Sequence, residues 1–281
     1  MQENKTNTGN ARLRICVVIP ARNSREYIGR CISSIHKQIL RPRTIIVIDD
    51  ASDDDTAEIA ERLGAYVIRI ERKHVYATGT PLLAFLINQG MQVCIENDHD
   101  FIFISGSDDI YPINYLRDLV KNMVRDKVVI ASGRVVGEPY DIEIPRGGGR
   151  VILSSFIKHT GLLKHVYGWE VEIVMRAWSH GLKTKTYPHL LFYSLRKSSR
   201  NPDKFYFLGK AMKELNYPVL YTLLRSLYTG FKLGSKYMYN MIYGYFNHNK
   251  RGVTLKESLV FRKKLLIKLI SLSQGLKSRV L

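Results

Sequence analysis

The chain has 281 residues, 45% hydrophobic and 24% charged, which is the composition of an ordinary globular protein with one sizeable core and a smaller appendage. It contains no run of about 18 uncharged apolar residues, so no membrane-spanning helix is predicted, and the polar residues 1–12 lack the apolar run of a secretion signal and are expected to form a flexible tail. The net charge is +18, and 15 of the 43 Lys and Arg lie from Lys204 onward against only two acids. This asymmetry predicts an anionic partner surface, either phospholipid or nucleic acid.

Apolar runs alternate with amphipathic segments through the first half of the chain. Buried strands are expected at 14–20, 44–48, 65–70, 101–104 and 127–132. Helices are expected at about 25–39, after Ser52, at 81–96 and at 114–125. This alternation predicts an α/β fold whose mostly parallel sheet is flanked by helices on both faces.

Acidic residues directly follow two of these strands. The strand at 101–104 leads to Asp108 and Asp109, and the strand at 44–48 leads to Asp49 and Asp50. Ligands of open α/β sheets collect at the carboxyl ends of the strands, and hard cations with their phosphates take oxygen ligands there. The alternative is that these carboxylates only cap turns and helices.

Three cysteines, Cys16, Cys31 and Cys94, are an odd number, and two of them lie inside apolar periodic segments. Neither a disulfide framework nor a metal-ligand spacing is present. We expect small buried thiols in a reducing compartment.

Beyond residue 137 the pattern changes. Residues 142–153 contain Pro145 and three consecutive glycines, which is too punctuated for a central strand and predicts a loop or an edge hairpin. Helices are expected at 156–163 and 170–180, and a strand at 183–187 that ends at Pro188. From about residue 205 the chain is expected to form amphipathic helices.

The C-terminal segment interleaves Tyr, Lys and Leu, a composition typical of helices that lie in a membrane interface. The alternative is that these helices pack on the rest of the protein and expose their lysines to water. We therefore expect three parts: the tail 1–12, an α/β domain at 13–200, and a basic amphipathic helical region at 201–281.

Five motifs, in order, resemble those of the inverting nucleotide-sugar glycosyltransferases of the family 2 type, whose fold is called GT-A. Residues 17–23 resemble "V-I-I-P-x-Y-N", 46–56 resemble "I-V-V-D-D-G-S-x-D-x-T", 88–90 resemble "A-x-N-x-G", 106–109 stand at the "D-x-D" position, and 169–181 resemble "E-D-x-(D/E)-L-x-x-R-x-x-x-x-G". The resemblance covers about residues 14–193. Each motif alone is weakly specific, whereas five in the correct order and spacing are specific.

The resemblance implies a nucleotide-sugar site and a divalent cation, Mn²⁺ or Mg²⁺. The residues expected to contact the donor are Pro20, Arg22, Asn23, Asp49, Asp50, Ser52, Ser107, Asp108 and Asp109. Asp108 stands where the family has its direct metal ligand, and Glu170 stands where it has its general base. His189 is a candidate for completing the metal shell, with a structural histidine as the alternative. Arg196 and Arg200, in a basic loop, are candidates for covering the diphosphate.

Two departures from the family pattern bear on the chemistry. Gly106 replaces the first acid of "D-x-D", so we expect weaker metal binding through Asp108. Trp169 replaces the Glu that precedes the base, and Glu170 replaces an Asp, which leaves the same proton transfer with one more methylene of reach. The alternative is a non-catalytic binding protein of the same fold.

The resemblance implies transfer of a hexose with inversion to a hydroxyl acceptor. The basic C-terminal helices favour a glycan or lipid-linked acceptor, and a peripheral location on an anionic membrane, at its inner, cytoplasmic face. A nucleic-acid partner is not expected, because the chain has no RNA-recognition signature or zinc spacing. A nucleotidyltransferase is disfavoured because the first strand is not followed by a Gly-rich, basic loop.

Overall fold

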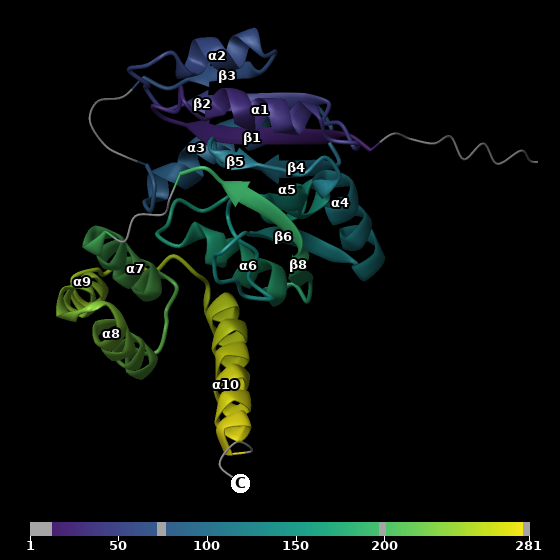
Figure 1. The fold of residues 1–281 in the computed structure, drawn as a ribbon. Helices are drawn as coiled ribbons and strands as arrows, with labels where there is room; N and C mark the ends of the chain where they lie inside the picture. The colour runs from purple at the N-terminus through teal and green to yellow at the C-terminus, as the bar shows by residue number, and fades with distance from the viewer. Residues whose placement is uncertain (1–12, 72–76, 197–200, 278–281) are drawn as a thin grey trace, which may run out of the picture.

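A computed structural model describes residues 13–71, 77–196 and 201–277, with side chains up to residue 267. The predicted tail at 1–12 lies outside the described residues. One sheet crosses the molecule and is covered by helices on both faces (Figure 1). Its strands are β1 (Ile15–Ala21), β2 (Thr44–Asp49), β3 (Tyr66–Arg69), β4 (Phe101–Ile104), β5 (Asp109–Ile110), β6 (Val128–Val135), β7 (Arg150–Leu153) and β8 (Lys183–Ser194). They are ordered β3-β2-β1-β4-β7-β6-β8-β5.

The central strands send side chains into two separate cores, one on each face of the sheet. In β1, Cys16 and Val18 face one core, whereas Ile15, Val17 and Ile19 face the other. This division follows from the two-residue period of a strand. The first core packs under α3 (Pro81–Glu96), α5 (Ser154–Thr160) and α6 (Trp169–Ser179), and the second under α1 (Ile28–His36), α2 (Thr56–Arg62) and α4 (Tyr115–Asp126). The predicted α/β class is therefore confirmed.

The sheet is mixed, and one prediction about it is wrong. β1 pairs in parallel with β2 and β4, and β6 with β8, but β7 lies antiparallel between β4 and β6 in the middle of the sheet. β7 occupies the segment that was expected to be a loop or an edge hairpin. Pro145 and the glycines precede the strand and do not interrupt it, so the buried residues Arg150–Leu153 pair on both sides.

The last strand, β8, also runs further than predicted. It continues through Pro188 to Ser194, because an irregularity in its pairing with β6 accommodates the proline. This extension carries the chain back to the carboxyl end of the sheet, where Ser194 pairs with Asp109 of β5.

Four helices form the C-terminal region: α7 (Pro202–Glu214), α8 (Val219–Leu233), α9 (Ser235–Phe246) and α10 (Leu255–Lys277). α7, α8 and α9 pack together to one side, and α10 packs on α6 (Figure 1). Met212, Met241 and Phe261 from these helices enter the same core as α3 and α6. No helix among the described residues is long and apolar enough to cross a membrane.

The cysteine prediction is wrong for two of the three residues. Cys16 of β1 and Cys94 of α3 form a disulfide, and their Cα atoms lie 5.7 Å apart although 78 positions separate them in the sequence. Cys31 is the free, buried thiol. The inference of a reducing compartment, which rested on unpaired thiols, loses its basis.

Candidate active site

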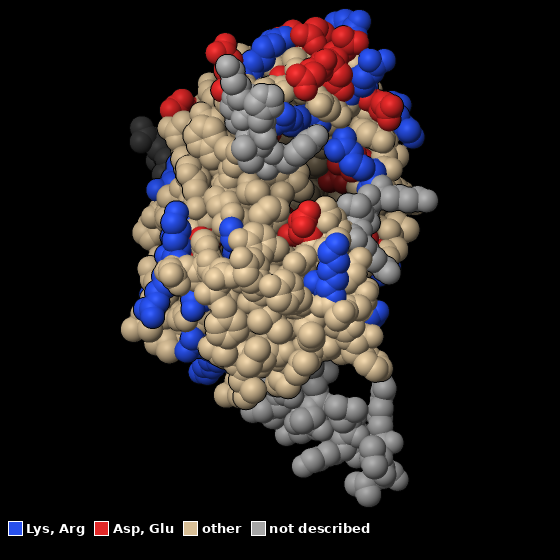
Figure 2. Space-filling view, turned by 90° about the vertical axis from the view of Figure 1, so that its left-hand side faces the viewer, with Lys and Arg blue, Asp and Glu red and all other residues tan. Residues whose placement is uncertain are grey.

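A cavity of about 210 Å³ lies where the carboxyl ends of β1, β2 and β4 meet. Figure 2 looks onto this edge of the sheet and shows acidic side chains in a hollow that basic side chains flank. The predicted residues that line the cavity are Pro20, Arg22, Asp50, Ser107 and Asp108. The sequence motifs thus converge on one site, as expected for loops that follow neighbouring strands.

Asp50 and Arg22 face each other across this cavity. Their side chains form an ion pair of 3.9 Å, and both are largely buried. The Asp50 N–H also donates to the Ala21 carbonyl, at 2.8 Å, which ties the β2 end to the β1 end. Asp50 is therefore held beside the cavity with its charge balanced by a cation of the preceding loop.

Three other predicted donor residues hold loops together and do not line the cavity. Asp49 accepts hydrogen bonds from the Ser52 hydroxyl, at 2.5 Å, and from the Ser52 N–H, at 3.3 Å. The Ser52 hydroxyl in turn accepts from the Asn23 N–H, at 3.0 Å, and the Asn23 side chain accepts from the Asp53 N–H, at 2.8 Å. In the part of the chain that is described, this arrangement matches the capping alternative for Asp49.

Asp108 and Asp109 follow β4 and point in different directions. Asp108 lines the cavity and accepts hydrogen bonds from the Ser194 hydroxyl, at 2.8 Å, and the Arg196 N–H, at 3.3 Å. Asp109 is buried and accepts from the Gly106 N–H, at 3.0 Å, and the Tyr111 hydroxyl, at 3.1 Å. Burial, reinforced by the neighbouring charge of Asp108, raises the pKa of Asp109 to about 6.

Arg196 closes one side of the cavity, as the sequence suggested for the basic loop. Its guanidinium donates to the Ser24 hydroxyl, at 3.3 Å, and lies 5.0 Å from the centre of the Tyr27 ring. The Ser24 hydroxyl also hydrogen-bonds to that of Ser107, at 2.9 Å. Sequence reasoning missed Ser24, although its place directly after the first motif was a usable signal. Arg200 lies outside the described residues.

Glu170 lines a neighbouring cavity of about 200 Å³. The glycine loop, residues 147–149 before β7, lies next to both Glu170 and Asp109, the neighbour of the cavity-lining Asp108. A Cβ on Gly147 would overlap the Glu170 carboxylate, and a Cβ on Gly148 would lie 2.7 Å from Asp109 Oδ2. Because consecutive Cα atoms are about 3.8 Å apart, the carboxylates of Glu170 and Asp109 lie within roughly 12 Å of each other.

Arg150 positions this glycine loop, and sequence reasoning missed it. Its buried guanidinium donates to the carbonyls of Pro145 and Arg146 in the loop and of Glu170 at the start of α6, the last at 3.1 Å. It also lies over the ring of Trp169, which takes the place of the family's Glu. Burial lowers the pKa of Arg150 to about 10. A charged residue at the start of an apolar strand was the available signal.

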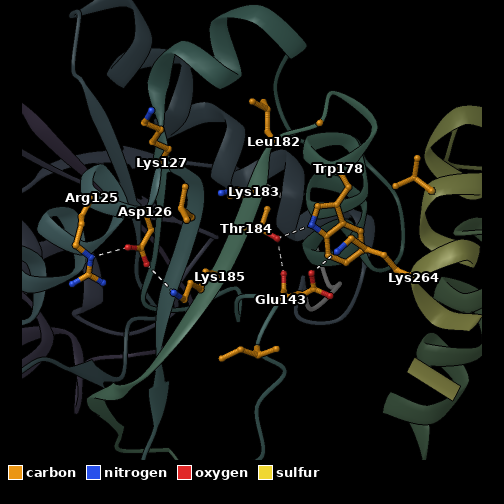
Figure 3. Close-up of a pocket in the computed structure, with 14 residues that line it drawn as sticks. Arg125, Asp126, Lys127, Glu143, Trp178, Leu182, Lys183, Thr184, Lys185 and Lys264 are labelled. Atoms are coloured by element: carbon orange, nitrogen blue, oxygen red, sulfur yellow. Dashed lines mark hydrogen bonds and ion pairs between the residues drawn. The ribbon is translucent and has the colours of Figure 1, made fainter. Parts of the chain in front are cut away.

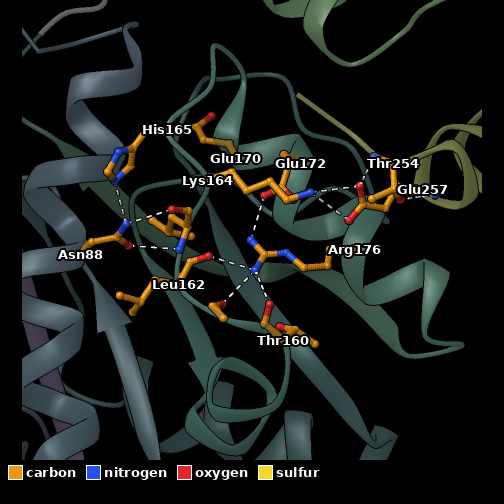
Figure 4. Close-up of polar contacts among 12 residues, drawn as sticks. Asn88, Thr160, Leu162, Lys164, His165, Glu170, Glu172, Arg176, Thr254 and Glu257 are labelled. Carbon is orange, nitrogen blue, oxygen red and sulfur yellow. Dashed lines mark hydrogen bonds and ion pairs between the residues drawn. The ribbon is translucent and has the colours of Figure 1, made fainter. Parts of the chain in front are cut away.

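The rest of the α6 motif is structural. Glu172 forms a buried ion pair with Arg176, at 2.8 Å, and another with Lys164, at 3.1 Å. Arg176 also donates to the carbonyls of residues 160–162, which hold the loop before α6 (Figure 4). The Glu170 carboxylate points away from this network (Figure 4). The two acids of one motif therefore have different environments.

His189 is not brought to Asp108, which corrects its predicted place. Its exposed ring lies 3.4 Å from the Asn122 side chain of α4 and packs edge-on against Tyr187. It precedes Ser194, which contacts Asp108, by five strand positions, or about 16 Å. Among the described residues, no three His, Cys, Asp or Glu side chains cluster in a way that could hold a metal ion.

A larger cavity, about 850 Å³, lies at the opposite end of the sheet, and none of the predicted site residues lines it. Its acids are paired with bases: Asp126 with Arg125 and Lys185, and Glu143 with Lys264 (Figure 3). Size alone therefore does not identify the site, and the converging strand ends do.

Comparison with known proteins agrees with this geometry. A model of the family described as "Glycosyl transferase family 2" matches residues 16–174. Over 119 residues the chain is 30% identical to the glycosyltransferase GlyG of Streptococcus pneumoniae, covering 42% of this chain and 38% of GlyG. Over 66 residues it is 39% identical to 4,4'-diaponeurosporenoate glycosyltransferase of Staphylococcus haemolyticus, covering 24% of this chain and 17% of that protein. These matches span well under half the length of each relative.

Two solved structures share the fold at low sequence identity. The mannosyltransferase PcManGT of Pyrobaculum calidifontis, in complex with GDP-Man and Mn²⁺, superposes with a TM-score of 0.58 at 14% identity, over 92% of this chain and 81% of that one. TarS of S. aureus in complex with UDP superposes with a TM-score of 0.55 at 17% identity, over 79% of this chain and 72% of that one. The GT-A architecture is thereby shown.

Proposed function

Because the chain belongs to glycosyltransferase family 2, we propose that it transfers a hexose, with inversion, from a nucleotide-sugar donor to the hydroxyl of a membrane-associated or lipid-linked glycan. The single observation that carries this proposal is the placement of the three carboxylates. Asp50 and Asp108 line one cavity at the strand ends, and Glu170 lines the next one beside the glycine loop.

The first cavity would take the donor. Asp50 would accept hydrogen bonds from the nucleobase or ribose. Asn23, Asp49 and Ser52 would act indirectly, by holding the two loops that frame the pocket. Arg22 and Arg196 would lie beside the diphosphate, and Ser107 would contact it from the β4 loop. Complexes with UDP and with GDP-Man among the structural neighbours support a nucleoside-diphosphate donor.

The residues present fit a divalent ion in part. Asp108 offers one carboxylate to the cavity, so diphosphate and water oxygens would complete the shell. A Mn²⁺ or Mg²⁺ ion bound there supplies positive charge for the leaving diphosphate. His189 is not a candidate for this shell, because it contacts α4 instead.

Glu170 would be the general base. Its carboxylate would take the proton of the acceptor hydroxyl while the hydroxyl oxygen forms its bond to the anomeric carbon. The bond from that carbon to the diphosphate breaks at the opposite face, and the diphosphate leaves with the electron pair. Attack from the face opposite the leaving group would invert the configuration at the anomeric carbon.

The C-terminal helices support a membrane-associated acceptor. On α8, Leu220, Leu224, Leu227 and Phe231 form an exposed stripe at helical spacing, and the Phe231 side chain is 94% exposed. Lys232 directly follows Phe231, and its ammonium lies 5.9 Å from the centre of the Tyr228 ring on the same helix. An apolar stripe with neighbouring cations is suited to an anionic membrane surface. The cytoplasmic leaflet carries such lipids, so we place the protein at the inner face of the membrane.

A panel of nucleotide sugars tests the proposal, with thermal shift measuring binding and product formation measuring transfer or hydrolysis, each with and without Mn²⁺. We expect one donor to bind and turn over, and Asp108→Ala to weaken both. Binding without turnover would instead favour a non-catalytic binding protein, the alternative suggested by Gly106 and Trp169 at the two motifs. Failure of every donor to bind would overturn the proposal.

A further inference from the structure

A fourth cavity, of about 370 Å³, lies between α6 and the C-terminal helices. Its walls are largely aromatic and aliphatic, with Trp178 from α6, Tyr217 and Tyr221 beside and on α8, and Phe261 and Leu265 from α10. Its volume is in the range of small-molecule sites, which are mostly apolar with a few polar groups. We call it the apolar groove.

The apolar groove adjoins the cavity of Glu170 and shares part of its wall with it. Asp141, Ile144 and Val171 line both, and Val171 directly follows Glu170 in α6. The groove and the Glu170 carboxylate are therefore neighbours on the same side of α6. This shared wall links the groove to the proposed chemistry.

Two buried polar atoms of the Glu170 cavity lack a hydrogen-bond partner in the described part of the chain. Within the described residues, neither the Arg134 Nε nor the Thr186 Oγ1 has a hydrogen-bond partner, although both atoms are buried. Thr186 is only 2% exposed, and both residues line the cavity. A buried donor without a partner costs about 1–3 kcal/mol. A guanidinium and a hydroxyl together are suited to the oxygens of an anionic group.

The rim of the groove carries basic side chains, which also suit a ligand with an anionic group. Arg225 on α8 and Lys264 on α10 line it, and Lys264 lies 4.5 Å above the Trp178 ring and pairs with Glu143 (Figure 3). The groove adjoins α8, whose exposed apolar stripe is the proposed membrane contact. An apolar chain leaving a bilayer at α8 would therefore meet the groove first and the Glu170 cavity second.

We propose that the acceptor is an amphiphile that carries, in this order, an apolar chain in the groove, a phosphate-type anion at Arg134 and Thr186, and a reacting hydroxyl at Glu170. This assignment rests on the proposed glycosyltransferase function and specifies its acceptor. It makes the apolar groove a specificity-determining site for the chain.

Binding of monomeric farnesyl phosphate to the full-length protein tests the assignment. Trp178 and Trp169 are the protein's two tryptophans, and only Trp178 lines the groove. We expect farnesyl phosphate to change the tryptophan emission, and Trp178→Phe to remove this change while calorimetry still detects binding. Farnesol should bind at least tenfold more weakly, and inorganic phosphate should leave the emission unchanged.

Matched variants locate the site. Tyr221→Asp places a charge in the groove and should weaken farnesyl phosphate binding at least tenfold. Leu224→Asp makes the same change three residues further along α8, outside the groove, and should alter binding less than twofold. Arg134→Gln should weaken farnesyl phosphate binding about tenfold and leave farnesol binding unchanged. The thermal midpoint of each variant establishes that it is folded.

Equal losses for Tyr221→Asp and Leu224→Asp would show adsorption to the α8 stripe and overturn the assignment. Equal affinity for farnesyl phosphate and farnesol would overturn the anion site. UDP and GDP binding, measured on the same samples, distinguishes failure of the acceptor assignment from failure of the proposed function. Intact donor binding and turnover without farnesyl phosphate binding overturns only the acceptor assignment, whereas loss of donor binding and turnover overturns the proposed function.

Discussion

The carboxylate of Asp109 occupies the space that a side chain at position 106 would need. A Cβ on Gly106 would lie 2.8 Å from Asp109 Oδ2, and the Gly106 N–H donates to this same oxygen. The glycine at the first position of the "D-x-D" motif and the buried Asp109 therefore depend on each other, because the Asp109 carboxylate fills the space that a side chain at position 106 would need.

This coupling predicts non-additive stability. Gly106→Ala should destabilise the protein by about 1–3 kcal/mol, because the hydrogen bonds from Gly106 and Tyr111 prevent Asp109 from moving aside. In the double variant with Asp109→Ala the space is free, so the combined loss should fall short of the sum by at least about 1 kcal/mol. Urea unfolding measures all three variants. Gly29→Ala is the control and should not destabilise the protein, because the nearest atom to its new methyl group would be 3.5 Å away. Additive losses for Gly106→Ala and Asp109→Ala would contradict the coupling.

The raised pKa of Asp109 predicts a pH-dependent stability. Its pKa is about 6 in the folded protein and about 4 in the unfolded chain, so the folded state holds the proton more tightly. The resulting contribution to the free energy of unfolding is up to about 3 kcal/mol. It is fully present below pH 4 and is lost as the pH rises through 6. Urea unfolding across this range, in EDTA, should show the decline in wild type and not in Asp109→Asn. An identical decline in both would rule out Asp109 as its source.

Two acids of α6 should respond differently to the same substitution. Glu170→Gln should lower kcat by about 10² to 10⁴, the usual contribution of a general base, with nucleotide affinity and thermal stability retained. Glu172→Gln should destabilise by about 3 kcal/mol, because it leaves Arg176 without its buried counter-charge. Steady-state kinetics and urea unfolding on both variants test this contrast. An active Glu170→Gln enzyme would remove Glu170 from the chemistry.

The glycine loop predicts an effect on catalysis without a change of the catalytic residue. In Gly147→Ala the new methyl group would overlap the Glu170 carboxylate, which must shift. We expect kcat to fall at least tenfold while KM for the donor stays within twofold, because Gly147 meets Glu170 and does not line the donor cavity. Kinetics on Gly147→Ala measure both parameters. Unchanged kcat would mean that the position of the Glu170 carboxylate is not critical.

The α8 stripe predicts membrane association. Wild type should float with anionic vesicles and less so as salt rises, because basic side chains contribute to attraction. Replacing Leu224, Leu227 and Phe231 with Asp should abolish flotation. Tyr66→Asp, on the exposed edge strand β3, is the matched control and should float like wild type. Flotation that survives the triple change would exclude this stripe as the contact.

Much of the fold could be predicted because the pattern of apolar and polar residues within short segments indicates most strands and helices. The apolar runs behind β1, β2 and β4 and the acids after them follow from neighbouring residues, and Asp50 and Asp108 do line one cavity. β7 could not be placed, because its central position depends on pairing with residues of β4 that lie 46 to 52 positions away and residues of β6 that lie 18 to 22 positions away. Pro145 and the glycines misled the prediction because they belong to the loop before the strand.

The sequence by itself determined the α/β alternation, the strand-end acids and the family motifs, since each depends on periodicity or spacing within a short segment. Only the tertiary structure decided that Cys16 meets Cys94, that Arg150 holds the glycine loop beside Glu170, and that His189 lies away from Asp108. These relationships join residues from separate elements. They arise when helices and strands pack to bury their apolar faces, and no local pattern encodes which distant side chains that packing brings together.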